Sequence, residues 1–268
     1  TMNDLKITGI DVTLCETRVK GNFADSTRNV ETIGFAVVDV STDQGLHGIG
    51  VTYHEVGGEA IRDFIKYAIE PKMIGRSPFE TEVLYEENFH YMRGVGRKGL
   101  AFCAYSAVDI ALWDLKGKAL GMPLFRLLGG TNPEVPIYAS GGWTSYSTEE
   151  LVEEAKTYLK GVHAVNVTDN QSSVMRLGSL AMCKVLKDAG MDPIFQLACR
   201  DRNRIALESD LLSAAMFGIE NILCLTGDHT KMGDHPQAKP VFDLDSVSLL
   251  HTVKLLESGV DLGGNQLV

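Results

Sequence analysis

Residues 135–171 constrain the fold of this chain more than any other stretch. Residues 135–143 read as a β-strand with its loop, residues 148–160 repeat apolar side chains with a helical period, and residues 164–167 form a second short apolar run. A strand, a helix and a strand in this order predict one βαβ unit, and such a unit requires a parallel sheet. We therefore expect an α/β fold with this unit at the start of its main sheet.

The composition is ordinary for a globular protein and argues against several classes of function. Of the 268 residues 44% are hydrophobic, which is enough for a sizeable core. The net charge of -10 disfavours a partner with a phosphate backbone or an anionic membrane surface. No apolar run approaches the ~20 residues that cross a bilayer, and the first residues lack the regions of a signal peptide. We expect a cytoplasmic protein that binds neither nucleic acid nor membrane.

The cysteines point to the same compartment. The chain has five, which are scattered and form no Cys-x-x-Cys pair. They are Cys15, Cys103, Cys183, Cys199 and Cys224. An odd number in apolar surroundings predicts buried thiols in a reducing cytoplasm, not disulfides or a zinc site.

The first half of the chain reads as a small antiparallel sheet followed by helices. Strands are expected at 5–12, 32–40 and 46–53, and helices from 59, at 77–91 and at 98–120. The helix at 98–120 is apolar on nearly all sides, which predicts that it is buried, and Gly121 is placed to end it. Residues 1–130 are therefore expected to form an α+β domain.

The second half alternates short strands with helices. Strands are expected at 164–167, 193–199 and 221–226, and helices at 175–190, 204–218 and 245–259. Asp245 is placed to cap the last helix. Each loop that follows a strand is polar, as in barrels and open α/β sheets whose ligands bind at the carboxyl ends of the strands. We expect a small-molecule ligand at that face.

A long motif in the buried helix carries the first family resemblance. Residues 104–130, AYSAVDIALWDLKGKALGMPLFRLLGG, resemble the signature of the mandelate racemase and muconate lactonising group of the enolase superfamily. The resemblance covers roughly residues 2–160. It implies a capping domain over 1–130 and a first barrel unit over 131–160, with a mobile lid loop at 17–30 and a second substrate-facing loop at 53–57.

Six polar residues of this region have both a structural and a functional interpretation. They are His54, Glu55, Asp109, Asp114, Lys116 and Lys118. For the four in the motif we favour buried ion pairs and caps, since tightly packed polar residues usually serve folding. The His-Glu pair lies in a glycine-flanked loop, where a ligand or catalytic role is the alternative to a structural one.

A second resemblance covers roughly residues 161–268. The clusters NVTDNQ at 166–171, CRDRNR at 199–204, LTGD at 225–228 and GDHPQAK at 233–239 resemble methylenetetrahydrofolate reductase, a flavin-dependent barrel enzyme. The resemblance implies cofactor-binding roles for Thr168, Gln196, Asp228, His235 and Lys239, the first three around the isoalloxazine. A carboxylate near N1 of the flavin would oppose the charge of the reduced ring and tune its potential.

The charged cluster at 199–204 leaves two interpretations open. Asp201, Arg202 and Arg204 either contact a ligand or cap helices and neutralise one another. Nothing in their spacing separates the two.

Neither resemblance brings a full catalytic set. The enolase-type base motif Lys-x-Lys is replaced by Asn166-Val-Thr168, and the expected carboxylate metal ligands do not follow the later strands. The reductase-type acid is absent from the strand at 137–143, because Glu149 and Glu150 come later, at a helix start. We therefore assign no catalytic residue and expect no metal.

These observations predict an α+β enolase-type capping domain (1–130) followed by a partial, half (β/α) barrel of about four βα units (131–268). Such a half barrel has open sheet edges, which predict a homo-oligomer. Our first functional hypothesis is a fused or recombined chain without a complete active site and with weak residual FAD binding.

Three other functions stay open. The first is a flavin-dependent methylenetetrahydrofolate reductase-type oxidoreductase completed by a partner chain. The second is a Mg-dependent acid-sugar dehydratase or racemase of the enolase superfamily, and the third is a structural scaffold. If the chain is an enzyme, we expect a flavin-dependent NAD(P)H oxidoreductase before a lyase or isomerase.

Overall fold

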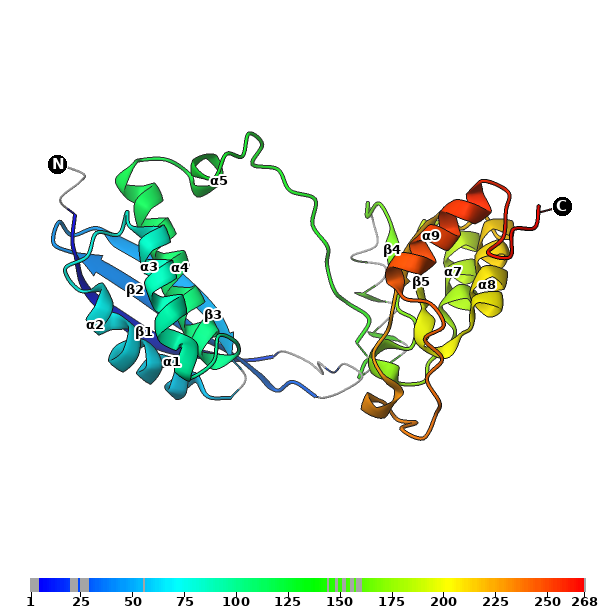
Figure 1. Cartoon of the computed structure of the whole chain (residues 1–268), viewed down its shortest axis with the longest axis horizontal. Helices are drawn as coiled ribbons and strands as arrows, with labels where there is room; N and C mark the ends of the chain where they lie inside the picture. The colour runs from blue at the N-terminus through cyan, green and yellow to red at the C-terminus, as the bar shows by residue number, and fades with distance from the viewer. Residues whose placement is uncertain are drawn as a thin grey trace. The chain divides into compact units, whose positions relative to one another are not determined.

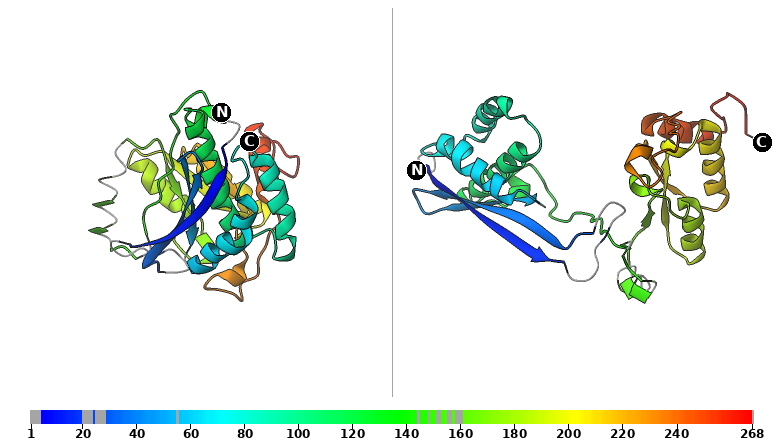
Figure 2. Two further views of the ribbon diagram at one scale, coloured as in Figure 1. Left: turned by 90° about the vertical axis from the view of Figure 1, so that its left-hand side faces the viewer. Right: turned by 90° about the horizontal axis from the view of Figure 1, so that it is seen from below.

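The structure is a computed structural model that describes residues 5–19, 24, 29–54, 56–143, 145–147, 149–150, 153–154, 157 and 161–267. The chain divides into two compact units, the first of Thr1–Phe23 and Val30–Ser140 and the second of Ala24–Asn29 and Gly141–Val268. Each unit has its own hydrophobic core. The two are therefore described separately (Figures 1 and 2).

The first unit contains the predicted antiparallel sheet. Its strands β1 (Ile7–Arg18), β2 (Thr32–Thr42) and β3 (His47–His54) lie in the order β1-β2-β3. Alternating residues of β2 are buried against helices, which is why this strand could be predicted from its period of two. Strand β1 continues well beyond its expected end at residue 12, because its hydrogen bonds to β2 extend to Arg18.

Helices cover one face of this sheet (Figure 1). They are α1 (Gly58–Phe64), a π-helical turn (Ile65–Ile69), α2 (Glu70–Met73), α3 (Thr81–Tyr91), α4 (Leu100–Ala119) and α5 (Leu124–Leu127). Helix α4 lies directly on β3, where a Cβ at Gly50 would come 1.8 Å from the Ala107 carbonyl oxygen. The prediction that α4 is buried is confirmed for the side that faces the sheet, whereas Leu100 and Ile110 are exposed. A helix on a sheet buries one side only.

The second unit contains the predicted parallel sheet. Strands β4 (Val165–Val167), β5 (Pro193–Ala198) and β6 (Asn221–Leu225) alternate with α7 (Ser179–Asp188), α8 (Arg204–Met216) and α9 (Ser246–Glu257). All three helices pack on the face that carries Phe195 and Leu197. Gln196 and Leu223 are register partners on the opposite face, where Leu223 is 40% exposed.

One predicted strand does not form. Residues 135–143 have no regular secondary structure, and Ile137 is 90% exposed. A strand exists only where a neighbour supplies hydrogen-bond partners, and Pro136 lacks an amide hydrogen. The helix predicted at 148–160 lies largely outside the described residues, and the positions described within it (149, 150, 153, 154 and 157) are helical.

The start of α9 agrees with the sequence prediction, whereas the start of α7 does not. Asp245 caps α9, since its Oδ1 accepts a hydrogen bond of 2.7 Å from the Ser248 amide. Helix α7 begins at Ser179, four residues later than predicted, and a separate turn at residues 171–173, in which Ser172 has φ 55°, precedes it.

The cysteines are free, as predicted, but not all are buried. Cys183 and Cys199 are buried, whereas Cys15 is exposed. It lies on β1, whose last four residues, 15–18, are all exposed. Among the described residues no helix has the length and apolar character to span a bilayer.

Candidate functional site

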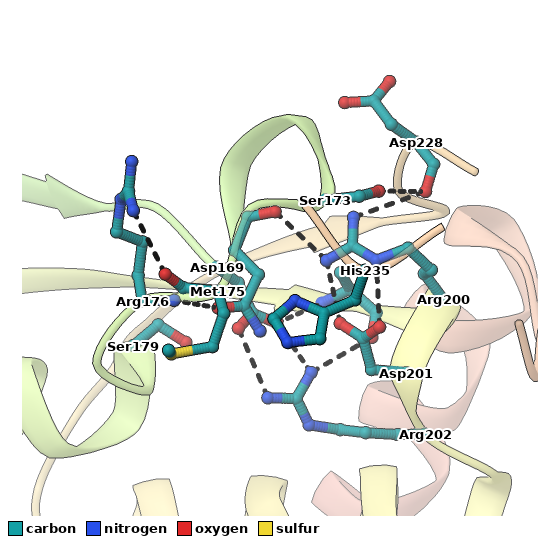
Figure 3. A network of polar contacts seen from close by, with 12 residues as sticks. Asp169, Ser173, Met175, Arg176, Ser179, Arg200, Asp201, Arg202, Asp228 and His235 are labelled. Atoms are coloured by element: carbon teal, nitrogen blue, oxygen red, sulfur yellow. Dashed lines mark hydrogen bonds and ion pairs between the residues drawn. The ribbon is translucent and has the colours of Figure 1, made fainter. Parts of the chain in front are cut away.

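The carboxyl ends of β4, β5 and β6 carry a network of charged side chains (Figure 3). Asp169 follows β4 with its side chain fully buried. Its carboxylate accepts hydrogen bonds from the Ala198 amide at 2.9 Å and from Arg202 Nη1 at 2.7 Å. Arg202 also forms an ion pair of 2.9 Å with Asp210 on α8. This part of the network joins β4, β5 and α8.

Arg200 is a second buried cation and joins three loops. The residue is 2% exposed. Its guanidinium donates to the Asp201 carboxylate at 2.8 Å, to the Asn170 carbonyl at 3.1 Å and to the Asp228 carbonyl at 3.4 Å. The loops after β4, β5 and β6 are therefore held together by one side chain.

The loop after β4 is packed closely against the loop after β6. Ser172 and Ser173 have positive φ, and Ser173 Oγ donates to the carbonyls of Asp228 at 3.0 Å and His229 at 3.1 Å. A Cβ at Gly233 would lie 1.8 Å from the Ser173 carbonyl oxygen, so only glycine fits there. On this polar face, hydrogen bonds and close backbone packing thus join the loop after β4 to the loop after β6.

The structure favours the structural interpretation of the charged cluster at 199–204, in which its side chains cap helices and neutralise other charges. Arg202 pairs with Asp169, and Asp201 with Arg200. Arg204 pairs with Asp243 at 2.8 Å, and this guanidinium lowers the pKa of Asp243 to about 2. These side chains already have partners of opposite charge and tie loops and helix starts together.

The five residues predicted to bind a cofactor lie on or beside this face. Thr168, Asp228, His235 and Lys239 are exposed, whereas Gln196 lies within β5. His235 Nδ1 lies 2.9 Å from Asp234, whose carboxylate accepts from the Met175 amide. The loop at 168–178 is thus hydrogen-bonded both to the Asp228 carbonyl and to Asp234 beside His235, so that Asp228 and His235 lie on the same face (Figure 3).

A magnesium site needs several oxygen ligands around one point. Within the described ranges no three His, Cys, Asp or Glu side chains lie together in a way that could hold a metal ion. The buried carboxylate of Asp169 is already used by Arg202. The residues that the structure describes therefore do not fit an enolase-type metal site.

In the first unit, β1 and β3 end at the same end of the sheet, where β2 begins. The register there pairs Arg18 with Thr32 and Gly34 with His54. The lid predicted at 17–30 lies mostly outside the described residues, as does Glu55. His54 is buried, and neither ring nitrogen has a hydrogen-bond partner.

The motif residues on α4 have structural roles, with one exception. Asp114 accepts from the Ile49 amide at 2.8 Å and pairs with Lys118, which donates to the His47 carbonyl at 3.0 Å. Lys116 Nζ lies 3.4 Å from Thr81 Oγ1.

Asp109 is the exception, and the ion pair predicted for it is wrong among the described residues. Burial, followed by the Glu82 charge, raises its pKa. Sequence reasoning missed this like-charged contact because Glu82 lies on α3, outside the motif.

Two protein families match the chain, one in each half. The family described as "Mandelate racemase / muconate lactonizing enzyme, N-terminal domain" matches residues 9–129. The family described as "Methylenetetrahydrofolate reductase" matches residues 143–262. Both resemblances found in the sequence are therefore present.

Curated relatives are enzymes of acid-sugar metabolism. The chain is 34% identical over 125 residues to 3,6-anhydro-alpha-L-galactonate cycloisomerase of Streptomyces coelicolor, covering 46% of this chain and 35% of that protein. It is 31% identical over 123 residues to L-talarate/galactarate dehydratase of Salmonella typhimurium, covering 45% and 31%. The chain spans about a third of the length of such relatives.

Solved structures of the enolase superfamily share the fold. L-talarate/galactarate dehydratase from Salmonella typhimurium LT2, liganded with Mg and L-lyxarohydroxamate, aligns with a TM-score of 0.63 and 19% identity over 82% of this chain and 58% of that one. A member of the enolase superfamily from Polaromonas sp. JS666 aligns with a TM-score of 0.61 and 25% identity over 81% and 58%.

Each alignment covers more residues than either unit contains, so each includes residues of both units. The chain has an enolase-type capping domain followed by part of a barrel.

These findings correct four predictions. A fused chain without a complete active site does not fit relatives that are acid-sugar dehydratases and cycloisomerases. A flavin-dependent oxidoreductase, FAD as cofactor and the absence of a metal conflict with the same relatives and with magnesium-bound neighbours. FAD is therefore no longer the expected cofactor, and none of these findings tests whether Thr168, Gln196, Asp228, His235 and Lys239 bind a ligand.

Proposed function

We propose that this chain is the cap and the first part of the barrel of an enolase-superfamily lyase or isomerase that acts on acid sugars. The observation that carries the proposal is the match of residues 9–129 to the family described as "Mandelate racemase / muconate lactonizing enzyme, N-terminal domain", on a unit in which β1 and β3 end at the same end of the sheet. Chain segments that leave a rigid sheet at one end are suited to cover a small substrate and exclude water from it. The relatives that match this unit act on acid sugars by name.

The polar face of the second unit supports a site for a small molecule at the strand ends. Parallel α/β sheets bind ligands at the carboxyl ends of their strands. The carboxylate of Asp228 is exposed there, while its backbone carbonyl is bound by Arg200 and Ser173. We include Asp228 in the proposed site as a group held in place by its main chain.

Magnesium is the cofactor that the solved neighbours suggest for the whole protein. The described residues do not supply a ligand set for it. No reaction step is therefore assigned to a metal on this chain.

Finer features of the architecture belong to the proposal as well. They are a domain boundary near residue 130, self-association through the open edges at β4 and β6, and a reducing cytoplasm for the free cysteines. Leu223, which is partly exposed on the uncovered sheet face, is the side chain through which association is most readily tested.

A substrate screen tests the proposal. The full chain is incubated with Mg²⁺ and galactarate, talarate, galactonate or mannonate, and a keto acid formed by loss of water is trapped with semicarbazide, while isomerisation is followed by NMR. We expect turnover, or saturable protection against thermal unfolding, with at least one acid sugar. The absence of both with every sugar acid, while neutral sugars behave identically, would overturn the proposal.

A further inference from the structure

Helix α8 carries apolar side chains on two opposite sides. The side that faces the core of the second unit is buried and consists of Leu207, Leu211 and Ala214. On the other side Ile205 is 74% exposed, Leu212 45% and Met216 86%. A helix on the surface of a globular protein buries one apolar side and exposes polar residues on the other. Packing within the second unit therefore does not explain the outer side of α8.

The outer side has the spacing of a coiled-coil seam. Its residues follow one another at steps of four, three and four positions, and they are Ile205, Ser209, Leu212 and Met216. These steps place the four side chains in one narrow line, which we call the outer seam and which extends along most of the 13 residues of α8. Such a seam is typical of a helix that packs along another helix, because its side chains fill the gaps between those of the partner.

The outer seam is complementary to a second copy of itself in the antiparallel direction. A two-fold axis midway along α8 would place Ile205 of one copy beside Met216 of the other. The same axis would place Ser209 beside Leu212, where the small serine leaves room for the leucine. Methionine is unbranched and flexible, so it can adapt to the branched isoleucine. The seam thus matches its own copy without any change in the backbone.

The charges at the two ends of α8 favour the antiparallel direction over the parallel one. Arg204 begins the helix, and its side chain, which pairs with Asp243, is 52% exposed. Phe217 follows the carboxyl end and is 36% exposed. In an antiparallel pair each Arg204 comes to the aromatic ring of the other copy and to the negative end of its helix dipole. A parallel pair would instead place two Arg204 side chains together and align the dipoles.

We propose that the outer seam of α8 is an interaction surface whose partner is the α8 of a second copy of this chain, packed antiparallel about a two-fold axis. This contact goes beyond the proposed function, because it needs no ligand and lies on the outer side of a helix. It also differs from association through the second sheet, since none of its residues belongs to a strand. One pair of helices is a small contact, so the dimer is expected to dissociate on dilution.

Sedimentation equilibrium of the full chain tests the surface. Every sample carries Leu223→Lys, so that association through the second sheet does not contribute. We expect a monomer–dimer equilibrium whose Kd rises at least tenfold with Leu212→Lys. The matched control is Leu250→Lys, since Leu250 is 53% exposed on α9, and it should leave Kd within twofold. A monomer at every concentration, or the same Kd in Leu212→Lys and its control, would overturn the proposal.

Disulfide cross-linking tests the direction of the pair. Ile205→Cys and Met216→Cys are prepared in separate chains that also carry Cys15→Ser, and the two are mixed and oxidised. The antiparallel pair predicts cross-links between the two variants and few within Ile205→Cys alone, whose two thiols would lie at opposite ends of the contact. The chain with only Cys15→Ser gives the background from the other thiols. Cross-links at background level, or mainly within Ile205→Cys alone, would overturn the proposal.

Discussion

The carboxylate of Asp169 and the guanidinium of Arg202 form a two-pronged contact, with Nη1 at 2.7 Å and Nη2 at 3.3 Å from the two carboxylate oxygens. Asp169 is fully buried, and Arg202 is 19% exposed at its side chain. The same carboxylate accepts from the Ala198 amide. One buried acid thus holds β4, β5 and α8 in place.

Removal of this acid is expected to destabilise the second unit strongly. Asp169→Ala leaves the Arg202 charge with Asp210 alone and the Ala198 amide without its acceptor. Breaking a buried pair costs about 3–5 kcal/mol, and we expect about 3 kcal/mol because one carboxylate remains. Urea unfolding followed by circular dichroism measures the change. Asp188→Ala, which breaks an exposed pair with Lys184, is the control and should cost under about 1 kcal/mol. Equal losses in the two variants would contradict the prediction.

Asp109 is expected to make the first unit less stable as pH rises. Burial, with a further contribution from Glu82, raises its pKa above the usual 3.8. The native state therefore keeps a proton that the unfolded chain has already released, and the free energy of unfolding falls between about pH 4 and the raised pKa. Asp109→Asn should remove this slope and be more stable than the wild type at neutral pH.

Urea midpoints between pH 4 and pH 7 measure this dependence. Glu82→Gln should weaken the slope without abolishing it, because burial is the larger cause. If Asp109→Asn has the same pH profile as the wild type, the raised pKa is not what sets it.

The cysteines are expected to react in an order set by their burial. Burial raises the pKa of Cys183 and Cys199 to about 11, so few thiolates form at pH 8. Cys15 is exposed on β1. With Ellman's reagent we expect one fast phase, which Cys15→Ser abolishes, and reaction of Cys183 and Cys199 only after unfolding. A fast phase that survives in Cys15→Ser would show that another thiol is accessible.

The second sheet is expected to associate with a further copy. Its edges at β4 and β6 are unpaired among the described strands, and Leu223 is partly exposed on the uncovered face. Light scattering after gel filtration should show a mass above that of the monomer. Leu223→Lys should lower it, whereas Leu250→Lys, a comparable change on the outside of α9, should not. A monomer at all concentrations would exclude this mode of association.

Much of the fold could be predicted from sequence because it depends on neighbours along the chain. The alternation in β2 and β3, the long apolar helix α4 and the Asp245 cap are local patterns. The capping motif at 104–130 also lies at the end of the region, residues 9–129, that the mandelate racemase / muconate lactonizing enzyme N-terminal domain family matches. The wrong functional ranking came from short polar clusters, whose residue types suit loop bonding as well as ligand binding.

The sequence by itself determined the secondary structure of most elements and their parallel or antiparallel order, since period and connection length are properties of the chain. Only the tertiary structure decided that residues 135–143 are not a strand, because pairing depends on a partner in space. It also decided that Asp169 is buried with Arg202 and that Gly34 and Gly58 enclose His54. Asp169 and Arg202 lie 33 positions apart in the sequence, and no local pattern shows that two such groups will meet.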